Sequence, residues 1–354
     1  MMIDIKTPNN AVLFAMQSRG EGVLLKFDQV TLQFAVTLSE LGAVKLESNY
    51  WLTRGAAVAL QKRSDSYALH QWLSQNDYVW QVGSHTLHDV SGVIYGVLNV
   101  SPESFYNGEL VSKKVDTMVS RAGEMLTLGA DVIEIGGQTT KPGYVELTAT
   151  EEINRISPVI KGIKQRFPEA IVAVDTYKYE VMVMAVALGV NIINDVNGFL
   201  DDERKGPFLA NKQVGLLTMW NPRTQAVTHL QQEMHDWFAE NLTALTAYGI
   251  DRERIALDPG VGYAKNSNGH QDLAMMNTIA HLQDFRRPIM TAVANKGWAK
   301  FLLDLPKNKR ADVSLIAANE MFRRGARILR VHDVQSAKQM VQVVQAISGS
   351  FLTS

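Results

Sequence analysis

The chain has 354 residues, a formal net charge of −1 and no cysteine. Its hydrophobic fraction of 46% and charged fraction of 20% are those of an ordinary globular protein. The lack of cysteine excludes disulfides, cysteine-ligated iron–sulfur clusters and thiolate catalysis, and the near-neutral charge without a basic tract argues against nucleic-acid binding. We see no signal peptide and no run of about 18 apolar residues, so we expect a cytoplasmic protein without a membrane span.

Residues 1–76 differ in pattern from the rest of the chain. Strands are predicted at 22–27, 43–48 and 56–61, and helices at 29–41 and 66–75. These elements indicate a small α+β domain of the ferredoxin-like kind, in which we find no catalytic signature. The next segment, residues 77–87, has the pattern of a hairpin that would close the bottom of the following domain.

From residue 93 onward, short apolar runs alternate eight times with helical stretches. The runs are Val93–Val100, Asp131–Gly136, Ile171–Asp175, Val190–Asn194, Val214–Met219, Ile255–Asp258, Ile289–Val293 and Arg327–Val331. Continuous apolar runs are typical of strands buried on both faces of a parallel sheet, and glycines at 129, 189 and 325 mark the preceding helix ends. Eight β/α units in series predict a (β/α)8 TIM barrel over residues 77–354. An open doubly wound sheet is the alternative.

Polar residues gather where these strands end. They are Asn99, Glu134, Asp175, Asn194, Asp195, Asp258, Asn295, Lys296, Arg330 and His332. In a β/α barrel the carboxyl ends of the strands meet at one mouth, where active sites lie. Carboxylates and amides there can bind the edge of a flat heterocycle, and the cations can bind phosphate. A single Asp after a strand is more often a turn former or helix cap. Polar residues at so many strand ends, however, favour a functional site.

The strand ends carry motifs that resemble a known family. The motifs are GVLNVSPESF (96–105), IGGQTTKPG (135–143), VDTYK (174–178), IINDVNG (192–198), LDPGVGYAK (257–265) and RVHDV (330–334). In this order, over about three quarters of the chain, they resemble dihydropteroate synthase. That resemblance implies a transferase of folate biosynthesis, which condenses 6-hydroxymethyl-7,8-dihydropterin diphosphate with 4-aminobenzoate and releases diphosphate. The extra N-terminal unit is similar to an extension of some members.

The resemblance also implies roles for individual residues. The matching pterin-binding positions are Asp175, Asn194, Met219, Asp258 and Lys296. The diphosphate-binding positions are Asn99, Thr140, Lys141, Arg330 and His332, with Mg²⁺ expected near Asn99. The aminobenzoate pocket corresponds to Pro142, Tyr263, Ala294 and Asn295. The resemblance implies a homodimer through the last barrel helices. Electrostatics and positioning account for such a reaction, so we assign no general base.

Several positions depart from the family pattern. They are Glu103, Glu134, Gln138, Thr139, Lys141, Trp220, Ala294 and Asn295. Ala294 and Asn295 replace a serine and an arginine next to the retained Lys296, and Lys141 lacks the planar fork of arginine. The ring-binding positions are kept, while those near the second substrate are altered. A homologue that binds pterin without catalysis therefore stays an alternative, as does a pterin-dependent methyltransferase, against which Asn99, Pro142 and the Arg330–His332 pair argue.

Overall fold

The computed structural model describes residues 2–18, 20, 22–64, 66–75, 78–89, 92–100, 111–138, 146–265 and 269–349. The chain divides into two compact units. One comprises the residues up to Tyr78 together with the end of the chain from Gln342, and the other is Val79–Val341. Each unit has its own sheet and its own apolar core.

The described part of the larger unit contains a barrel of eight parallel strands. They are β7 (Val93–Asn99), β8 (Val132–Gly136), β9 (Ile171–Asp175), β10 (Ile192–Asp195), β11 (Gly215–Met219), β12 (Ile255–Asp258), β13 (Met290–Thr291) and β14 (Ile328–Val331). Neighbouring strands pair in the order β12-β11-β10-β9-β8-β7-β14-β13, and a parallel bridge between Leu257 and Ile289 closes the ring. The predicted (β/α)8 TIM barrel is confirmed, and the open sheet is excluded.

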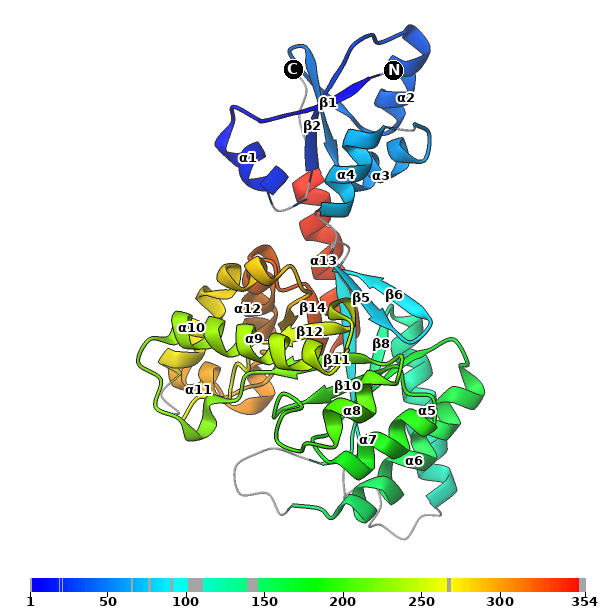
Figure 1. Ribbon diagram of the computed structural model, residues 1–354, viewed down its shortest axis with the longest axis vertical. Helices are drawn as coiled ribbons and strands as arrows, with labels where there is room; N and C mark the ends of the chain where they lie inside the picture. Colours follow the sequence, from blue (N-terminus) through cyan, green and yellow to red (C-terminus); the bar gives the residue numbers. More distant parts are fainter. Residues whose placement is uncertain are drawn as a thin grey trace. The chain divides into compact units, whose positions relative to one another are not determined.

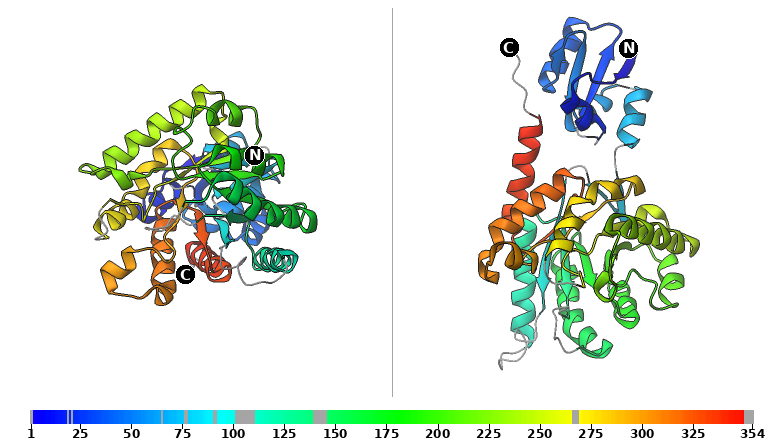
Figure 2. Two further views of the ribbon diagram at one scale, coloured as in Figure 1. Left: turned by 90° about the horizontal axis from the view of Figure 1, so that it is seen from below. Right: turned by 90° about the vertical axis from the view of Figure 1, so that its left-hand side faces the viewer.

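Helices surround the strands on the outside of the barrel (Figures 1 and 2). They are α5 (Val111–Thr127), α6 (Ala149–Arg166), α7 (Tyr179–Ala187), α8 (Lys205–Ala210), α9 (Leu230–Ala247), α10 (His270–Asn277), α11 (Trp298–Leu303), α12 (Ala311–Arg323) and the part of α13 (Val334–Gly349) up to Val341, with short 3-10 helices at Pro222–Thr224, Arg252–Arg254, Ile279–Phe285 and Lys307–Lys309. Gly129, Gly189 and Gly325 have φ values of 99°, 79° and 106°, which is the left-handed region that the predicted glycine turns require. None of the helices in the described ranges is long and apolar enough to cross a membrane.

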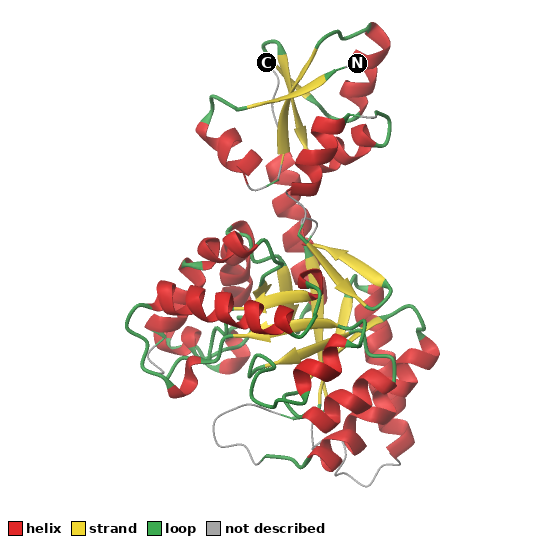
Figure 3. Ribbon diagram, viewed as in Figure 1, coloured by secondary structure: helices red, strands yellow, loops and turns green. Residues whose placement is uncertain are grey.

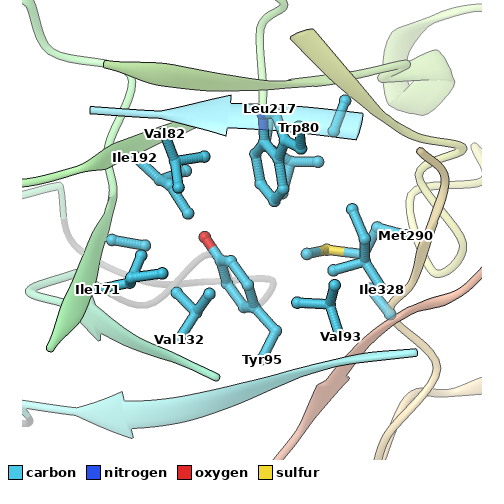
Figure 4. Packing of buried hydrophobic residues seen from close by; sticks show 13 residues of the cluster. Trp80, Val82, Val93, Tyr95, Val132, Ile171, Ile192, Leu217, Met290 and Ile328 are labelled. Atoms are coloured by element: carbon cyan, nitrogen blue, oxygen red, sulfur yellow. The ribbon is translucent and has the colours of Figure 1, made fainter. Parts of the chain in front are cut away.

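A hairpin closes the bottom of the barrel, as predicted. Its strands are β5 (Val79–Val82) and β6 (His85–His88). Trp80 is fully buried and stacks on Tyr95 of β7, with ring centroids 6.4 Å apart. Figure 4 shows the Tyr95 ring pointing into the middle of the barrel core, which inward-facing residues of neighbouring strands surround. The polar residues of the barrel mouth lie next to this apolar layer, toward the carboxyl ends of the strands.

The smaller unit is a four-stranded antiparallel sheet with helices (Figure 3). Its elements are β1 (Ile3–Lys6), α1 (Ala11–Ser18), β2 (Gly22–Phe27), α2 (Leu32–Glu40), β3 (Val44–Leu46), β4 (Asn49–Thr53), α3 (Arg54–Gln61) and α4 (Tyr67–Gln75). The sheet order is β1-β2-β4-β3 and every pair is antiparallel. The prediction of a ferredoxin-like sheet is therefore wrong, because that arrangement contains a parallel pair joined through a helix.

One predicted strand of this unit is also wrong. Residues 56–61 lie in α3, which begins after Thr53, whose side chain accepts a hydrogen bond from Ala56 N at 3.3 Å. Alanine is the best helix former, and the cap satisfies one of the free amides of the first turn. Ala56, Ala57 and Leu60 are buried at helical spacing, so the apolar run forms one face of a helix. The strands β1 and β4 and the helix α1 were not predicted.

Candidate active site

The alternation of side chains along each barrel strand determines which residues enter the mouth. Successive side chains of a strand point to opposite faces, so a residue two positions after an inward-facing core residue also points inward, one layer higher. Val132, Ala173, Ile192, Leu217, Ala256 and Ile328 belong to the core layer. Two positions later stand Glu134, Asp175, Asn194, Met219, Asp258 and Arg330. The barrel therefore brings all of the strand-borne ring-binding candidates into one layer, together with Arg330, which was predicted for diphosphate, and Glu134.

Four of these side chains, from four strands, form one hydrogen-bonded chain. Arg330 Nε donates to Glu134 Oε2 at 2.6 Å, and Arg330 Nη2 donates to Asp175 Oδ2 at 3.1 Å. Asn194 Nδ2 donates to Glu134 Oε1 at 3.1 Å. Glu134 is fully buried, whereas about a fifth of the Arg330 and Asp175 side chains stays exposed. We call Glu134, Asp175, Asn194 and Arg330 the inner cluster.

Asp258 and Lys296 lie on the other side of the mouth. Asp258 is 3% exposed, and its Oδ1 accepts a hydrogen bond from Gly260 N at 2.8 Å. The Asp258 carboxylate is thus a turn former and a member of the polar layer at once. Lys296 Nζ donates to the Val261 carbonyl. Gly262 has a φ of 88°, and a Cβ there would stand 2.5 Å from Lys296 Cδ, so glycine makes room for the lysine side chain.

Burial governs the charges of this layer. Burial, and then the neighbouring Glu134, raises the pKa of Asp175 to about 7, although Arg330 opposes the shift. Burial also raises the pKa of Asp258, against the attraction of Lys296. Burial lowers the pKa of Lys296 to about 8. The site therefore holds a carboxyl and an amine that both titrate near neutral pH, which is typical of functional sites.

An aromatic and apolar wall borders the polar layer. Met219, Val196 and Tyr263 pack together in one buried cluster, with Tyr177 against it. Arg223 Cζ lies 4.3 Å and Lys296 Nζ lies 5.2 Å from the centre of the Tyr263 ring. Two cations thus lie against one aromatic ring, which a flat anionic ligand can exploit. Arg223 was not among the predicted site residues, because it lies in the loop after β11 and has no signal of its own there.

The outer part of the site lies around Asn99, Ala294, Asn295 and His332. A cavity of about 120 Å³ brings Ala294, Asn295, Arg330 and His332 together with the start of α12. Burial, and then Arg330, lowers the pKa of His332. Asn295 has a φ of 58°, and its backbone N donates to Ser314 Oγ at 3.2 Å. Thr140, Lys141 and Pro142, predicted for diphosphate and aminobenzoate, lie outside the described residues.

Comparisons with known proteins agree with this geometry. The model of the pterin binding enzyme family matches residues 95–332. Dihydropteroate synthase of Bacillus subtilis is 33% identical over 255 residues, covering 72% of this chain and 88% of that protein. The chain belongs to the dihydropteroate synthase family. It is accordingly an enzyme of the transferase class. The Escherichia coli dihydropteroate synthase is 32% identical over 262 residues, covering 72% of this chain and 90% of that protein.

Solved structures of the family have the same barrel. Dihydropteroate synthase of Xanthomonas albilineans with 4-aminobenzoic acid matches with a TM-score of 0.70 and 28% identity, covering 77% of this chain and 98% of that one. The same enzyme in complex with 7,8-dihydropteroate matches with a TM-score of 0.65 and 27% identity, covering 74% and 95%. More than nine tenths of each of these two solved chains is matched.

Some residues that shape the mouth were not predicted. Lys178 Nζ donates to Glu152 Oε2 at 2.7 Å and to Gln138 Oε1 at 2.8 Å, and Gln138 Nε2 donates to the Tyr177 hydroxyl at 3.0 Å. These contacts join the exits of β8 and β9 to α6. The sequence placed Lys178 in the VDTYK motif but gave no signal of its partners, because they lie 26 and 40 residues away in the chain.

Asn99 is the residue expected to hold Mg²⁺. No group of three or more His, Cys, Asp or Glu that could hold a metal ion exists among the residues that the structure describes. Asn99 is exposed at the end of β7, opposite Gly136 of β8. A Cβ on Gly136 would stand 3.6 Å from Asn99 Oδ1, so glycine leaves the amide oxygen accessible. One amide oxygen suits Mg²⁺, which completes its shell with water and phosphate oxygens.

Proposed function

We propose that the protein condenses 6-hydroxymethyl-7,8-dihydropterin diphosphate with 4-aminobenzoate, giving 7,8-dihydropteroate and diphosphate. The observation that carries the proposal is the polar layer of Asp175, Asn194 and Asp258 at the barrel mouth, with Lys296 beside it. Its oxygens accept hydrogen bonds from ring N–H and amino groups, and its amine donates to a ring carbonyl or nitrogen. A 2-amino-4-oxo pteridine presents that set of partners along one edge. Carboxylate acceptors give such bonds added strength.

We place departure of diphosphate at the outer side of the inner cluster. The bond between the pterin methylene carbon and the diphosphate oxygen breaks, and its electron pair leaves with diphosphate. Arg330 and His332 would stabilise the charge on that leaving group, and Thr140 and Lys141 are proposed to join them. Mg²⁺, when bound at Asn99 and the diphosphate, would supply further neutralisation. The cation that develops on the methylene carbon would face Asp175 and Asp258, whose negative charge favours it.

The second substrate would arrive from the aromatic side of the mouth. The amine nitrogen of 4-aminobenzoate donates its lone pair to the methylene carbon and then releases a proton to solvent. We propose that Tyr263 and Pro142 border the aminobenzoate ring, and that Ala294 and Asn295 lie near its carboxylate. Both substrates are held in place rather than activated by a base, so positioning supplies much of the rate.

A turnover assay tests the proposal. The protein is supplied with 6-hydroxymethyl-7,8-dihydropterin diphosphate, 4-aminobenzoate and Mg²⁺, and diphosphate and dihydropteroate are both quantified. We expect the two products to appear in equal amounts and the rate to fall when Mg²⁺ is chelated. Saturable pterin binding without either product would contradict the synthase activity. Methyl transfer from a methylated pterin to cobalamin would instead identify a methyltransferase.

A pterin-binding protein without synthase activity is the second candidate. The observation that favours it is the loss of a serine hydroxyl at Ala294 and of an arginine charge at Asn295, beside an intact inner cluster. The aminobenzoate carboxylate would then lack a partner, while the pterin ring keeps its own. Binding of dihydropterin that 4-aminobenzoate neither strengthens nor converts would support this candidate.

We also propose a homodimer, a cytoplasmic location and a division into domains of residues 1–76 and 77–354. The exposed apolar side chain of Ile316, on α12 of the barrel unit, supports the dimer. The absence of cysteine supports a reducing compartment. Light scattering of the full chain at several concentrations measures the oligomeric state directly.

A further inference from the structure

Glu134 occupies a position that the reaction described above does not require. It stands in the middle of β8, between Val97 of β7 and Ala173 of β9 in the strand register. Its side chain is fully buried, and both of its oxygens accept hydrogen bonds. A buried carboxylate is costly unless it is paired in this way. Its partners are Asn194 and Arg330, and both belong to the ring-binding side of the mouth.

The chemistry of a carboxylate fixes how Asn194 is turned. An ionised carboxylate can only accept hydrogen bonds, whereas a carboxamide has a donating and an accepting end. Asn194 must therefore direct its Nδ2 to Glu134, and the Oδ1 end faces the opposite way. That Oδ1 is buried and has no hydrogen-bond partner among the residues that the structure describes. An unpartnered buried acceptor is unfavourable and indicates a ligand or an ordered water that donates to it.

Asn194 Oδ1 lies in the inward-facing layer of the barrel. Asn194 comes two residues after Ile192 of the core layer and pairs with Asp175 in the register of β9 and β10. The orientation that Glu134 imposes thus adds a third acceptor to those of Asp175 and Asp258. Arg330 is tied to the same carboxylate, so it cannot turn its own donors toward Asn194 without losing the bond to Glu134 Oε2.

We propose that Glu134 is a positioning residue that fixes the Asn194 carboxamide with its oxygen toward the ring pocket and thereby selects a 2-amino pteridine over its 2-oxo counterpart. The inference rests on the proposed pterin binding and deepens it. The 2-amino group donates to an acceptor, whereas a 2-oxo group meets the same acceptor with a second oxygen. Glu134 does not contact the ligand and acts only through Asn194.

A ligand pair measures this selection. Isothermal titration gives the affinities of 6-hydroxymethylpterin and of 6-hydroxymethyl-lumazine, its 2-oxo counterpart, for the full chain and for Glu134→Gln. Glutamine at this position can direct its oxygen to Arg330 and its NH2 to Asn194, so that Asn194 turns over and presents Nδ2 to the pocket. We expect the pterin-to-lumazine ratio of affinities to fall by about tenfold or more, because one hydrogen bond is lost with one ligand and gained with the other.

Two further variants separate positioning from a general loss of structure. Glu134→Asp keeps an acceptor-only group, so it should retain the ratio even if both affinities fall. In an Asn194→Ala background, Glu134→Gln should leave the ratio unchanged, because the residue through which it acts is gone. Circular dichroism and thermal unfolding confirm that each variant is folded.

The outcomes distinguish this inference from the proposed function. If the unaltered protein binds neither ligand, the pterin-binding proposal itself fails. If it prefers the pterin and Glu134→Gln keeps the same ratio, the positioning role of Glu134 is wrong while pterin binding stands. If Glu134→Gln changes the ratio equally with and without Asn194, the carboxylate acts by another route and the inference is also overturned.

Discussion

The inner and the outer parts of the barrel mouth differ in how they are built. Side-chain hydrogen bonds join the four residues of the inner cluster, which lie on barrel strands. Beside it, Asp258 and Lys296 bond to backbone groups of the loop after β12. The outer part, around Asn99, His332, Ala294 and Asn295, lies at strand ends and in loops and carries two departures from the family pattern, Ala294 and Asn295. The positions that we propose for ring binding are therefore set by strand geometry, whereas those that we propose for the second substrate lie in loops that can change without disturbing the barrel.

The largest effect is expected at the inner cluster. Asp175→Asn should weaken binding of 6-hydroxymethyl-7,8-dihydropterin by about a hundredfold or more, because a charge-assisted acceptor is lost and an amide group faces ring donors. Isothermal titration measures the affinity. Asp236→Asn, at an exposed position of α9, is the matched control and should bind like the unaltered protein. Equal affinities for both variants would contradict the assignment of the inner cluster to pterin binding.

The next largest effect is expected on stability, at the buried ion pair of Lys205 and Asp195 beside the inner cluster. Lys205 is fully buried and its Nζ lies 2.7 Å from Asp195 Oδ2, next to Asn194 in the chain. Lys205→Met leaves the buried Asp195 unpaired, and we expect it to lower the free energy of unfolding by about 3 kcal/mol. Urea unfolding at neutral pH measures the loss.

The neighbouring arginine provides the control for this measurement. Arg204 forms an ion pair with Asp202, but half of its side chain is exposed. Arg204→Met should leave the unfolding transition unchanged, because exposed ion pairs contribute little. A similar destabilisation in both variants would show that burial does not distinguish the two pairs.

The pH dependence of binding tests the electrostatics of the same layer. The pKa of Asp175 is raised to about 7, so the acceptor is fully ionised only above that pH, and the pKa of Lys296 is lowered to about 8, so its charge is lost above that pH. Affinity for the dihydropterin should therefore be highest between the two values and fall by about tenfold per pH unit on either side.

Lys296→Arg separates the acidic from the alkaline decline in affinity. Arginine stays charged at every accessible pH, so the decline on the alkaline side should disappear while the acidic side is kept. The titration of the ligand alone, measured in parallel, is subtracted. An alkaline decline that persists in Lys296→Arg would assign it to another group.

The smallest effect is expected in the outer part. Restoring the family residues with Ala294→Ser and Asn295→Arg together should lower the KM for 4-aminobenzoate about threefold to tenfold, through one hydroxyl and one charge. The gain is limited because position 295 has a left-handed φ of 58°, which asparagine tolerates better than arginine. Ala294→Ser with Asn295→Gln is the uncharged control. A larger change in dihydropterin affinity than in KM would contradict the separation of the two parts.

Much of the inner part could be predicted from the sequence. Apolar runs defined the eight strands, and the alternation of side chains then carried Asp175, Asn194 and Asp258 into one layer. Glu134 was noticed as a polar residue of its strand and as a departure from the family, but nothing in its segment reveals that Asn194 and Arg330 are its partners. Those contacts depend on how strands far apart in the chain close into a ring.

The rest could not be predicted, for different physical reasons. The run Ala56–Gln61 was predicted as a strand because a short apolar run is compatible with the periodicity of a helix and with that of a strand. The Thr53 cap favours the helix. β1 and β4 are strands of only four and five residues, and both pair with β2, a contact that their own segments do not reveal. In the loops, the stacking of Arg223 on Tyr263 joins residues 40 positions apart and left no pattern in either segment.

The central claim is that the inner part of the mouth binds a pterin ring. Isothermal titration of the unaltered full chain with 6-hydroxymethyl-7,8-dihydropterin tests it without requiring turnover. We expect saturable one-to-one binding at micromolar concentrations, with a favourable enthalpy from the hydrogen bonds to Asp175, Asn194 and Asp258. An absence of saturable binding up to millimolar ligand, in a protein whose circular dichroism shows it to be folded, would contradict the account.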